Sequence, residues 1–303
     1  MAGLKVALIG ATPTFLELLA DSGLVISALY PLAAQDDGSL LEHGDDVWPV
    51  IGLDDFDFAD VDLLLCLADP ELAQAAIPQA LAAGLTVLDA SNAGVAAGDK
   101  GRLLSLPHIA ALQLARPLQS LAAAGGIEAA SASVFLPVSA SGQAGVDELS
   151  AQVRSLFAHG DISSKVFAKR IAFNLLPDFS AALRGGIASQ LGKMTEGLQL
   201  DTLQLIHMPV FYGMSASLTM RLKSAMSDAE VRAALAANEG LLVLPEGQLV
   251  ATQDVIGADK VWVGDVALSA DGRTLQLWLL ADNSRLQAMT VLAVLLQLAA
   301  SRH

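Results

Sequence analysis

Short apolar runs alternate with helical segments over the first hundred residues, and this alternation limits the fold more than any other feature of the chain. Thr12 and Pro13 suit the cap and the first position of a helix, and Asp69-Pro70 suits the start of another. The predicted strands are Leu4–Ile9, Leu24–Tyr30, Val61–Leu67 and Leu85–Asp89, and the predicted helices are Phe15–Leu19 and Glu71–Ala83. Strands that alternate with helices predict a parallel sheet with helices on both faces.

A different pattern begins after about residue 105. The predicted helices are Pro107–Leu121, Ala144–Phe157 and Leu286–Ala300, and the predicted strands are Ile127–Val138, Leu203–Met208, Ser217–Leu222, Val261–Leu268 and Leu275–Leu280. The last three strands have period two, and Asp271-Gly272 marks a hairpin turn, so the later strands are expected to pair antiparallel. We therefore expect an α/β domain over residues 1–105 with the C-terminal helix 284–303, and an α+β domain with a mixed or antiparallel sheet over residues 106–283.

Charge and composition exclude several classes of protein. The net charge is −15, and the segment between Val6 and Asp99 holds 16 of the 32 acids with no Lys or Arg, which argues against a nucleic-acid partner. The apolar segments Leu72–Leu88 and Leu286–Ser301 are interrupted by polar residues, so no membrane span and no membrane partner are expected. Cys66 is the one cysteine, which excludes an internal disulfide and favours a cytoplasmic protein.

Six segments occur in the same order, and at nearly the same spacing, as motifs of one known family. They are Gly10-Ala-Thr12, Ser139-Ala-Ser-Gly-Gln-Ala-Gly-Val-Asp-Glu-Leu149, Phe167-Ala-Lys-Arg-Ile-Ala-Phe-Asn-Leu-Leu-Pro177, Pro209-Val-Phe-Tyr-Gly213, Val261-Trp-Val-Gly264 and Leu277-Trp-Leu-Leu-Ala-Asp-Asn283. Over essentially the whole chain, they resemble aspartate-semialdehyde dehydrogenase. The resemblance implies a Rossmann-like N-terminal domain, a second domain for catalysis and dimerisation, and a homodimer. The apolar segments Ile127–Val138 and Ala172–Leu176, both taken as strands, suit a dimer face as well as a core.

The resemblance also implies a chemistry, which is the NADPH-dependent reduction of aspartyl phosphate in amino-acid biosynthesis. A cysteine nucleophile forms a thioester, a histidine acts as acid and base, a glutamine orients the acyl group and an arginine holds the substrate carboxylate. A thiolate, an imidazole and a guanidinium are each suited to these roles.

All four matched positions carry a different chemical type in this chain. The nucleophile position falls at His108, with a register uncertainty of one residue, and no residue from Ser105 to Ile109 is cysteine. The acid/base, arginine and glutamine positions are Met214, His207 and Leu136. A thioether transfers no protons, and an alkyl chain orients no oxygen. We interpret Cys66, within a predicted buried strand, as an inert thiol.

The dinucleotide fingerprint is also incomplete. The resemblance places weak cofactor contacts at Gly10, Ala11, Thr12 and Asn283. Two fingerprint glycines are replaced by Pro13 and Leu16, and Asp36 and Asp37 follow the second strand where a 2′-phosphate would need a base. No cofactor is therefore expected, and NAD or NADP is implied by the resemblance alone. An acidic side chain there would suit the ribose hydroxyls of NAD, so NAD binding remains an alternative.

Three functions are compatible with these observations. The first is a catalytically inactive, dimeric binding protein, the second an active oxidoreductase with an altered mechanism and His108 in the nucleophile's place, and the third a small-molecule sensor. For His108 and His207 the alternatives are action as a base, binding of an anion or a metal, or a role in packing alone. No metal site is expected, because two histidines lack the further ligands that a metal needs. Arg184 and Lys193 are interpreted as surface charges.

Overall fold

The computed structural model describes residues 3–36, 38–43 and 46–301 and divides into two compact units. Unit 1 comprises Met1–Leu106 and Gln287–His303, and unit 2 comprises Pro107–Leu286. Each unit has its own sheet and its own hydrophobic core. No helix among the described residues combines the length and the apolar character needed to cross a bilayer.

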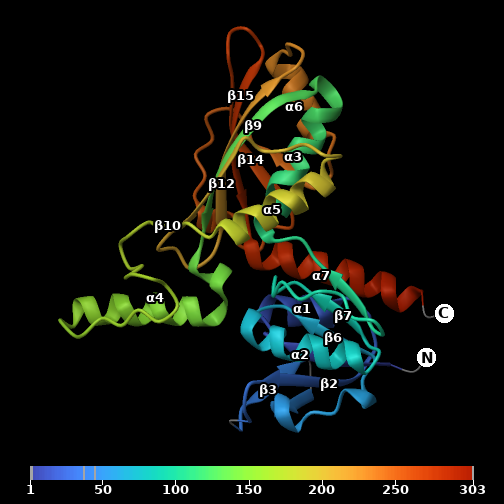
Figure 1. Ribbon diagram of the computed structural model, residues 1–303. Coiled ribbons are helices and arrows are strands. Elements are labelled where there is room, and N and C mark those ends of the chain that lie inside the picture. The colour runs from blue at the N-terminus through green and yellow to red at the C-terminus, as the bar shows by residue number, and fades with distance from the viewer. Residues whose placement is uncertain (1–2, 37, 44–45, 302–303) are drawn as a thin grey trace. The chain divides into compact units, whose positions relative to one another are not determined.

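Unit 1 is built on a six-stranded parallel sheet, as the alternating pattern predicted (Figure 1). In spatial order the strands are β5 (Ile51–Gly52), β2 (Ile26–Ala33), β1 (Leu4–Ile9), β6 (Leu63–Cys66), β7 (Thr86–Asp89) and β8 (Arg102–Ser105). The helix α2 (Pro70–Ala82) packs on one face. The helix α1 (Pro13–Asp21) packs on the other, together with the part of α7 (Asn283–Ala300) from Gln287 on.

Capping and side-chain bonds fix these helices. Thr12 accepts a hydrogen bond from the Phe15 amide at 3.3 Å and caps α1, and Asp69 caps α2, both as predicted. Gln287 of α7 donates to the carbonyl oxygens of Leu67 and Ala90, each at 3.0 Å. Because these carbonyls follow β6 and β7, the amide of Gln287 fastens α7 to the carboxyl end of the sheet.

One hairpin of unit 1 was missed by the sequence prediction. The strands β3 (Leu40–His43) and β4 (Asp46–Pro49) pair antiparallel and form a separate two-stranded sheet. Leu41 and Trp48 pack against the core beneath α1. Strands of four residues with acids among them carry too weak a periodic signal to be recognised.

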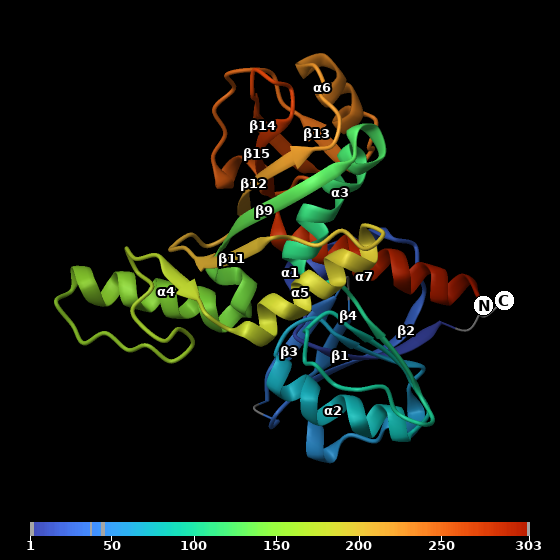
Figure 2. The same ribbon diagram turned by 45° about the horizontal axis from the view of Figure 1, so that its top comes forward.

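Unit 2 contains a seven-stranded mixed sheet, and Figure 2 shows its strands with helices packed against it. In spatial order the strands are β10 (Leu176–Asp178), β11 (Thr202–His207), β9 (Ile127–Leu136), β12 (Met214–Leu222), β15 (Thr274–Ala281), β14 (Val261–Leu268) and β13 (Leu241–Val243). The helices α3 (Ile109–Gly125), α5 (Ala181–Met194) and α6 (Asp228–Ala236) contribute to the core that covers one face. The predicted hairpin at Asp271-Gly272 is confirmed, since β14 pairs antiparallel with β15.

Two details of unit 2 differ from the prediction. Leu203–Met208, expected to pair antiparallel, forms β11, which does pair antiparallel with β10 but runs parallel to β9 on its other side. The parallel pairing arises because two intervening helices return the chain to the same end of the sheet. Ala172–Leu176 is not a strand. Phe173 has φ +60° in a turn, and the short strand β10 begins only at Leu176.

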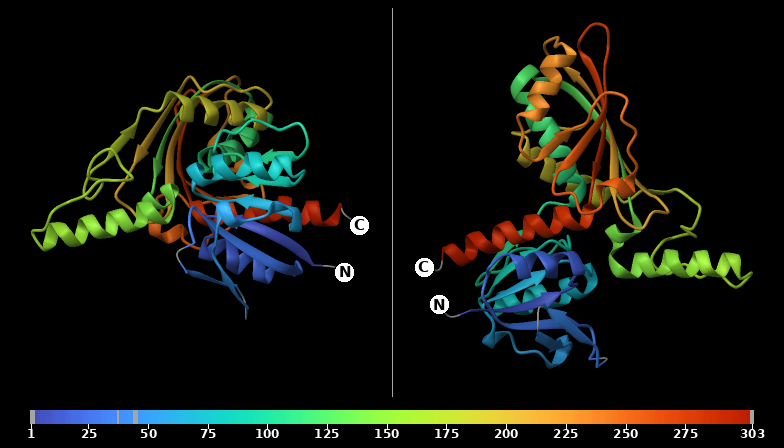
Figure 3. Two further views of the ribbon diagram at one scale, coloured as in Figure 1. Left: turned by 60° about the horizontal axis from the view of Figure 1, so that its bottom comes forward. Right: turned by 180° about the vertical axis from the view of Figure 1, so that it is seen from behind.

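The helix α4 (Gly142–Phe157) and the irregular segment 158–175 form an arm, which Figure 3 shows beside the sheet of unit 2. Glu148 of α4 organises the arm, because its carboxylate accepts hydrogen bonds from the amides of Lys165, Val166 and Phe167 at 2.7, 2.6 and 3.4 Å. One turn later Gln152 accepts from the amides of Ile171 and Ala172 at 2.9 and 3.1 Å and donates to the carbonyl oxygen of Ser163 at 2.9 Å. Two buried side chains of one helix face thus fix a segment that has almost no secondary structure.

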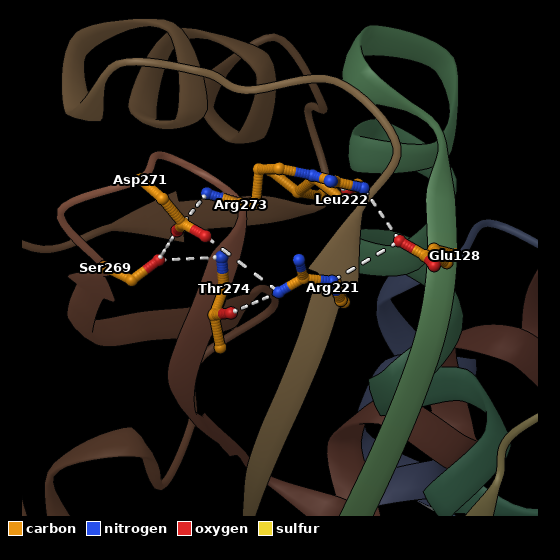
Figure 4. A network of polar contacts seen from close by, with 7 residues as sticks. All are labelled: Glu128, Arg221, Leu222, Ser269, Asp271, Arg273 and Thr274. Atoms are coloured by element: carbon orange, nitrogen blue, oxygen red, sulfur yellow. Dashed lines mark hydrogen bonds and ion pairs between the residues drawn. The ribbon is translucent and has the colours of Figure 1, made fainter.

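A polar network ties three strands together at the hairpin end of the sheet (Figure 4). Glu128 of β9 lies 2.8 Å from Nη2 of Arg273 and 3.4 Å from Nε of Arg221, on β12. Hydrogen bonds from the Ser269 hydroxyl and the Arg273 amide lower the pKa of Asp271 in the turn. The charged side chains are 35 to 55% exposed, so the network fixes the geometry of the turn more than it adds stability.

Candidate functional site

The four positions matched by resemblance lie on elements that meet at one end of the unit 2 sheet. His207 ends β11 and is the register partner of Leu136, which ends β9. Met214 begins the neighbouring strand β12. His108 caps α3, and Gln113 of that helix donates from Nε2 to the carbonyl oxygen of Met214 at 3.4 Å.

Leu136 and Met214 are parts of the hydrophobic core. Leu136 is 2% exposed and Met214 is 0% exposed, and both pack in the cluster that joins the sheet to its helices. Neither side chain can donate, accept or transfer a proton at neutral pH. These two positions therefore contribute packing and not chemistry.

His108 is held by its backbone neighbours. Its Nδ1 accepts a hydrogen bond from the Ala110 amide at 3.1 Å, and its own amide donates to Oε1 of Gln190, on α5, at 2.8 Å. Burial lowers the pKa of His108 to about 4; the Asp178 carboxylate opposes this change and His207 adds to it. At neutral pH the imidazole is therefore uncharged, and Nε2 carries its hydrogen.

His207 is oriented by an acidic neighbour. Its Nε2 lies 3.3 Å from Oδ2 of Asp178, which ends β10. The ring of Phe167, from the arm, meets the imidazole edge to face with centroids 5.4 Å apart. The other ring nitrogen, Nδ1, is buried and has no hydrogen-bond partner in the described part of the chain.

The two histidines do not form a recognisable metal centre. Over residues 3–36, 38–43 and 46–301, no group of three or more His, Cys, Asp or Glu side chains is arranged to hold a metal ion. Nδ1 of His108 is already occupied by a backbone amide.

Cys66 lies in the other unit, within β6, and is completely buried. Burial first, and then the charge of Asp89, raises the pKa of its thiol. A thiol that does not ionise near neutral pH is a poor nucleophile.

The first turn of unit 1 offers few donors to a dinucleotide. Gly10 has φ +72°, and a Cβ there would lie 2.6 Å from the Cβ of Ala68, so the turn packs tightly against the chain after β6. Pro13 carries no amide hydrogen, and Thr12 engages the amides of Phe15 and Leu16. Among the first four positions of α1, the Thr14 amide alone remains for a ligand, and this donor set does not fit a pyrophosphate, which needs several amides.

The acids after the second strand, and Asn283, which the resemblance assigns to the cofactor, were the other residues considered for this site. Asp36 accepts a hydrogen bond from the Gly38 amide, and Asp37 lies outside the described residues. Asn283, 3% exposed, accepts from the Gly213 amide at 3.2 Å and donates to Oγ of Ser139 at 3.0 Å. Asn283 thus links the start of α7 to the loops that follow β9 and β11.

The sequence prediction missed four residues of this site, which are Gln113, Phe167, Asp178 and Gln190. Asp178 precedes Ser180, the cap of α5, and accepts from its amide at 2.7 Å, so a capping pattern could have located it. Gln113 is a polar residue on the apolar stripe of a predicted helix, which is an unusual placement that could have indicated a buried role. Phe167 begins one of the six segments matched by resemblance but was given no role, and Gln190 gave no sequence signal.

The model of the semialdehyde dehydrogenase dimerisation domain matches residues 118–286, which is more than half of the chain. The chain belongs to the aspartate-semialdehyde dehydrogenase family. The match to the dimerisation domain covers the arm, Leu136, His207 and Met214, and begins ten residues after His108.

Relatives within the aspartate-semialdehyde dehydrogenase family cover nearly the whole chain. The aspartate-semialdehyde dehydrogenase of Legionella pneumophila is 28% identical, with 95% of this chain and 93% of the relative covered. A Pseudomonas aeruginosa protein named USG-1 protein homolog is 30% identical over 93% of each chain. The solved structure of a "probable aspartate-semialdehyde dehydrogenase" from Pseudomonas aeruginosa has a TM-score of 0.82 and 28% identity, and covers 97% of this chain and 99% of its own.

Proposed function

We propose that this family member has lost the dehydrogenase reaction and acts as a dimeric protein that binds a small ligand. The observation that supports this function is the chemistry of the four matched positions, His108, Leu136, His207 and Met214. None carries a thiol, and Leu136 and Met214 belong to the core. Cys66 is buried in unit 1 with a raised pKa. Function follows the site and not the fold, so the scaffold is retained for binding.

The first turn of unit 1 supports the absence of a cofactor. An NADP pyrophosphate would meet a proline, a self-capped helix end and the surface of a strongly acidic segment. We infer that NADP does not bind, and that NAD, which lacks the 2′-phosphate, binds weakly if at all.

The catalytic prediction is tested by an NADPH absorbance assay with aspartate semialdehyde and phosphate. We expect no turnover above the rate without protein, because no group can form or resolve a thioester. Calorimetric titration is expected to show no heat of NADP binding. Turnover that is abolished by His108→Ala would contradict the proposal and would establish an altered mechanism instead.

The arm supports a homodimer. Its surface carries large apolar side chains that a protein stable as a monomer would bury. Phe157 is 76% exposed and Phe173 is 65% exposed, and the centroids of their rings lie 6.4 Å apart. Phe179, just beyond the arm, is 77% exposed. All three lie within the segment that matches the dimerisation domain. Exposed aromatic side chains, including a contacting pair such as Phe157 and Phe173, are typical of a protein interface.

Replacing Phe173 with aspartate is expected to dissociate the dimer. Aspartate tolerates the positive φ at this position, so the fold should be retained while the interface gains a charge. Loss of an aromatic anchor weakens association by about thirtyfold or more. Light scattering after size exclusion should give a mass near the 31.3 kDa of one chain. Val25→Asp, at a 60% exposed position in unit 1, is the control that should stay dimeric, and a dimeric Phe173→Asp protein would contradict the assignment of this face.

A further inference from the structure

Two buried acceptor atoms near the matched positions are reached by no donor of the described chain. They are Nδ1 of His207 and Oε1 of Gln113, and the side chain of Gln113 is 0% exposed. Burying an acceptor without a partner destabilises a fold, so such atoms are uncommon, and a bound water, ion or ligand can supply the missing donor.

Both side chains belong to the helix-covered face of the sheet. Leu205 packs in the core between the sheet and its helices, and His207 lies two residues further along the same strand, hence on the same face. Gln113 belongs to α3 and contacts the carbonyl oxygen of Met214, on the strand beyond β9. The two acceptors therefore face the same layer at the same end of unit 2.

Asp178 determines which nitrogen of His207 is the acceptor. Its Oδ1 accepts from the Ser180 amide at 2.7 Å, which fixes the carboxylate at the start of α5, and its Oδ2 faces Nε2 of His207 at 3.3 Å. A carboxylate accepts, so Nε2 must donate, and the neutral ring then has its lone pair on Nδ1. A protonated ring would instead bury an N–H at Nδ1 with no acceptor.

The charged and titratable groups recorded as interacting with His207 and His108 do not favour an anion. Asp178 is negative, and His108 is uncharged at neutral pH. The nearest cation along α5, Arg184, turns back to the carbonyl oxygens of Phe179 and Ser180. The resemblance places a carboxylate-binding arginine, a cationic donor, at the position of His207. Here the same position offers a hydrogen-bond acceptor beside a carboxylate, so it suits a donor and not an anion.

We propose that this end of unit 2 takes a small ligand that presents an ammonium or amide N–H group to Nδ1 of His207, with Asp178 as the residue that holds the ring in its accepting tautomer. This ligand class rests on the proposed binding function. A ligand whose only polar groups are carboxylates is excluded, because its oxygens would face the lone pair of the imidazole and the charge of Asp178.

Three probes with four carbons and different ends test the ligand class. They are 1,4-diaminobutane, 4-aminobutyrate and succinate. Long-range ¹H–¹⁵N spectra of the full-length protein report the tautomer of each histidine and its response to a probe. We expect the Nε2–H tautomer at His207, a shift of its Nδ1 signal with the two amines, and a raised melting temperature with the same two. Succinate should change neither, and the exposed His159 should respond to none.

Two variants separate positioning from folding. His207→Phe keeps an aromatic ring beside Phe167 but removes the acceptor, so amine binding should weaken about tenfold or more. Asp178→Ala should leave His207 with mixed tautomers, a signature that loss of stability alone does not produce. Preferential binding of succinate, an Nδ1–H tautomer in the unmodified protein, or no response to either amine would overturn the proposal. Turnover in the NADPH assay would overturn the proposed function instead and would leave the ligand class intact.

Discussion

Replacing Glu148 with alanine is expected to destabilise unit 2 by about 3 kcal/mol and to release the arm. The carboxylate is 9% exposed and accepts from three consecutive backbone amides, Lys165 to Phe167, two of them at 2.7 and 2.6 Å. Without it these amides lose charge-assisted hydrogen bonds, and the segment keeps only the hydrogen bonds to Gln152 and the apolar packing of Phe167, Ile171 and Ala172 among its described contacts with α4. The arm also carries the proposed dimer face, so dissociation should accompany the loss of stability.

Urea unfolding at fixed protein concentration measures the effect, since the stability of a dimer depends on concentration. Hydrogen exchange at the three amides should accelerate by more than the global loss explains, because the arm opens locally. Asp147→Ala is the matched control. Asp147 precedes Glu148 on the same helix but is exposed, and among the described residues only Gln143 donates to it, so a change within about 0.5 kcal/mol is expected. Equal effects of the two substitutions would show that Glu148 does not organise the arm.

Local sequence signals were sufficient for most of the fold. The parallel sheet of unit 1 followed from apolar runs that alternate with capped helices, and the hairpin after β14 followed from Asp271-Gly272. The signals failed where pairing depends on distant segments. The parallel partnership of β11 with β9 spans two helices, and the turn at Phe173 forms because α4 supplies side-chain acceptors to the backbone before it.

The sequence predicted which positions would come together in the candidate site, but not the residues that contact them. Resemblance located His108, Leu136, His207 and Met214, and the topology brings their elements to one end of a sheet. The contacts that give these positions their character come from elsewhere in the chain. Asp178 reaches His207 across 29 residues, and Gln190 reaches His108 across 82, at spacings that no local motif specifies.

The loop before Met214 is the second place where a single substitution should have a large effect. Gly213 has φ +86°, and a Cβ on it would lie 2.1 Å from the carbonyl oxygen of Thr252 and 2.8 Å from its carbonyl carbon. Both are backbone atoms, so no side-chain rotation relieves the overlap. Gly213→Ala adds the cost of a left-handed alanine to the cost of overpacking, and we expect a loss of about 3 kcal/mol or more, measured by urea unfolding.

Gly247→Ala separates the two costs. Gly247 has a similar φ of +73°, but a Cβ there meets nothing within 4 Å, so this variant should lose only about 1 kcal/mol, the cost of the backbone conformation. The difference between the variants is then the cost of the close approach to Thr252. Because the Gly213 amide donates to Asn283, only Gly213→Ala should also shift the side-chain amide resonances of Asn283. If both variants lost the same free energy of unfolding, the loop before Met214 would be able to move away from Thr252 at no cost. The position of Met214 would then not depend on this contact.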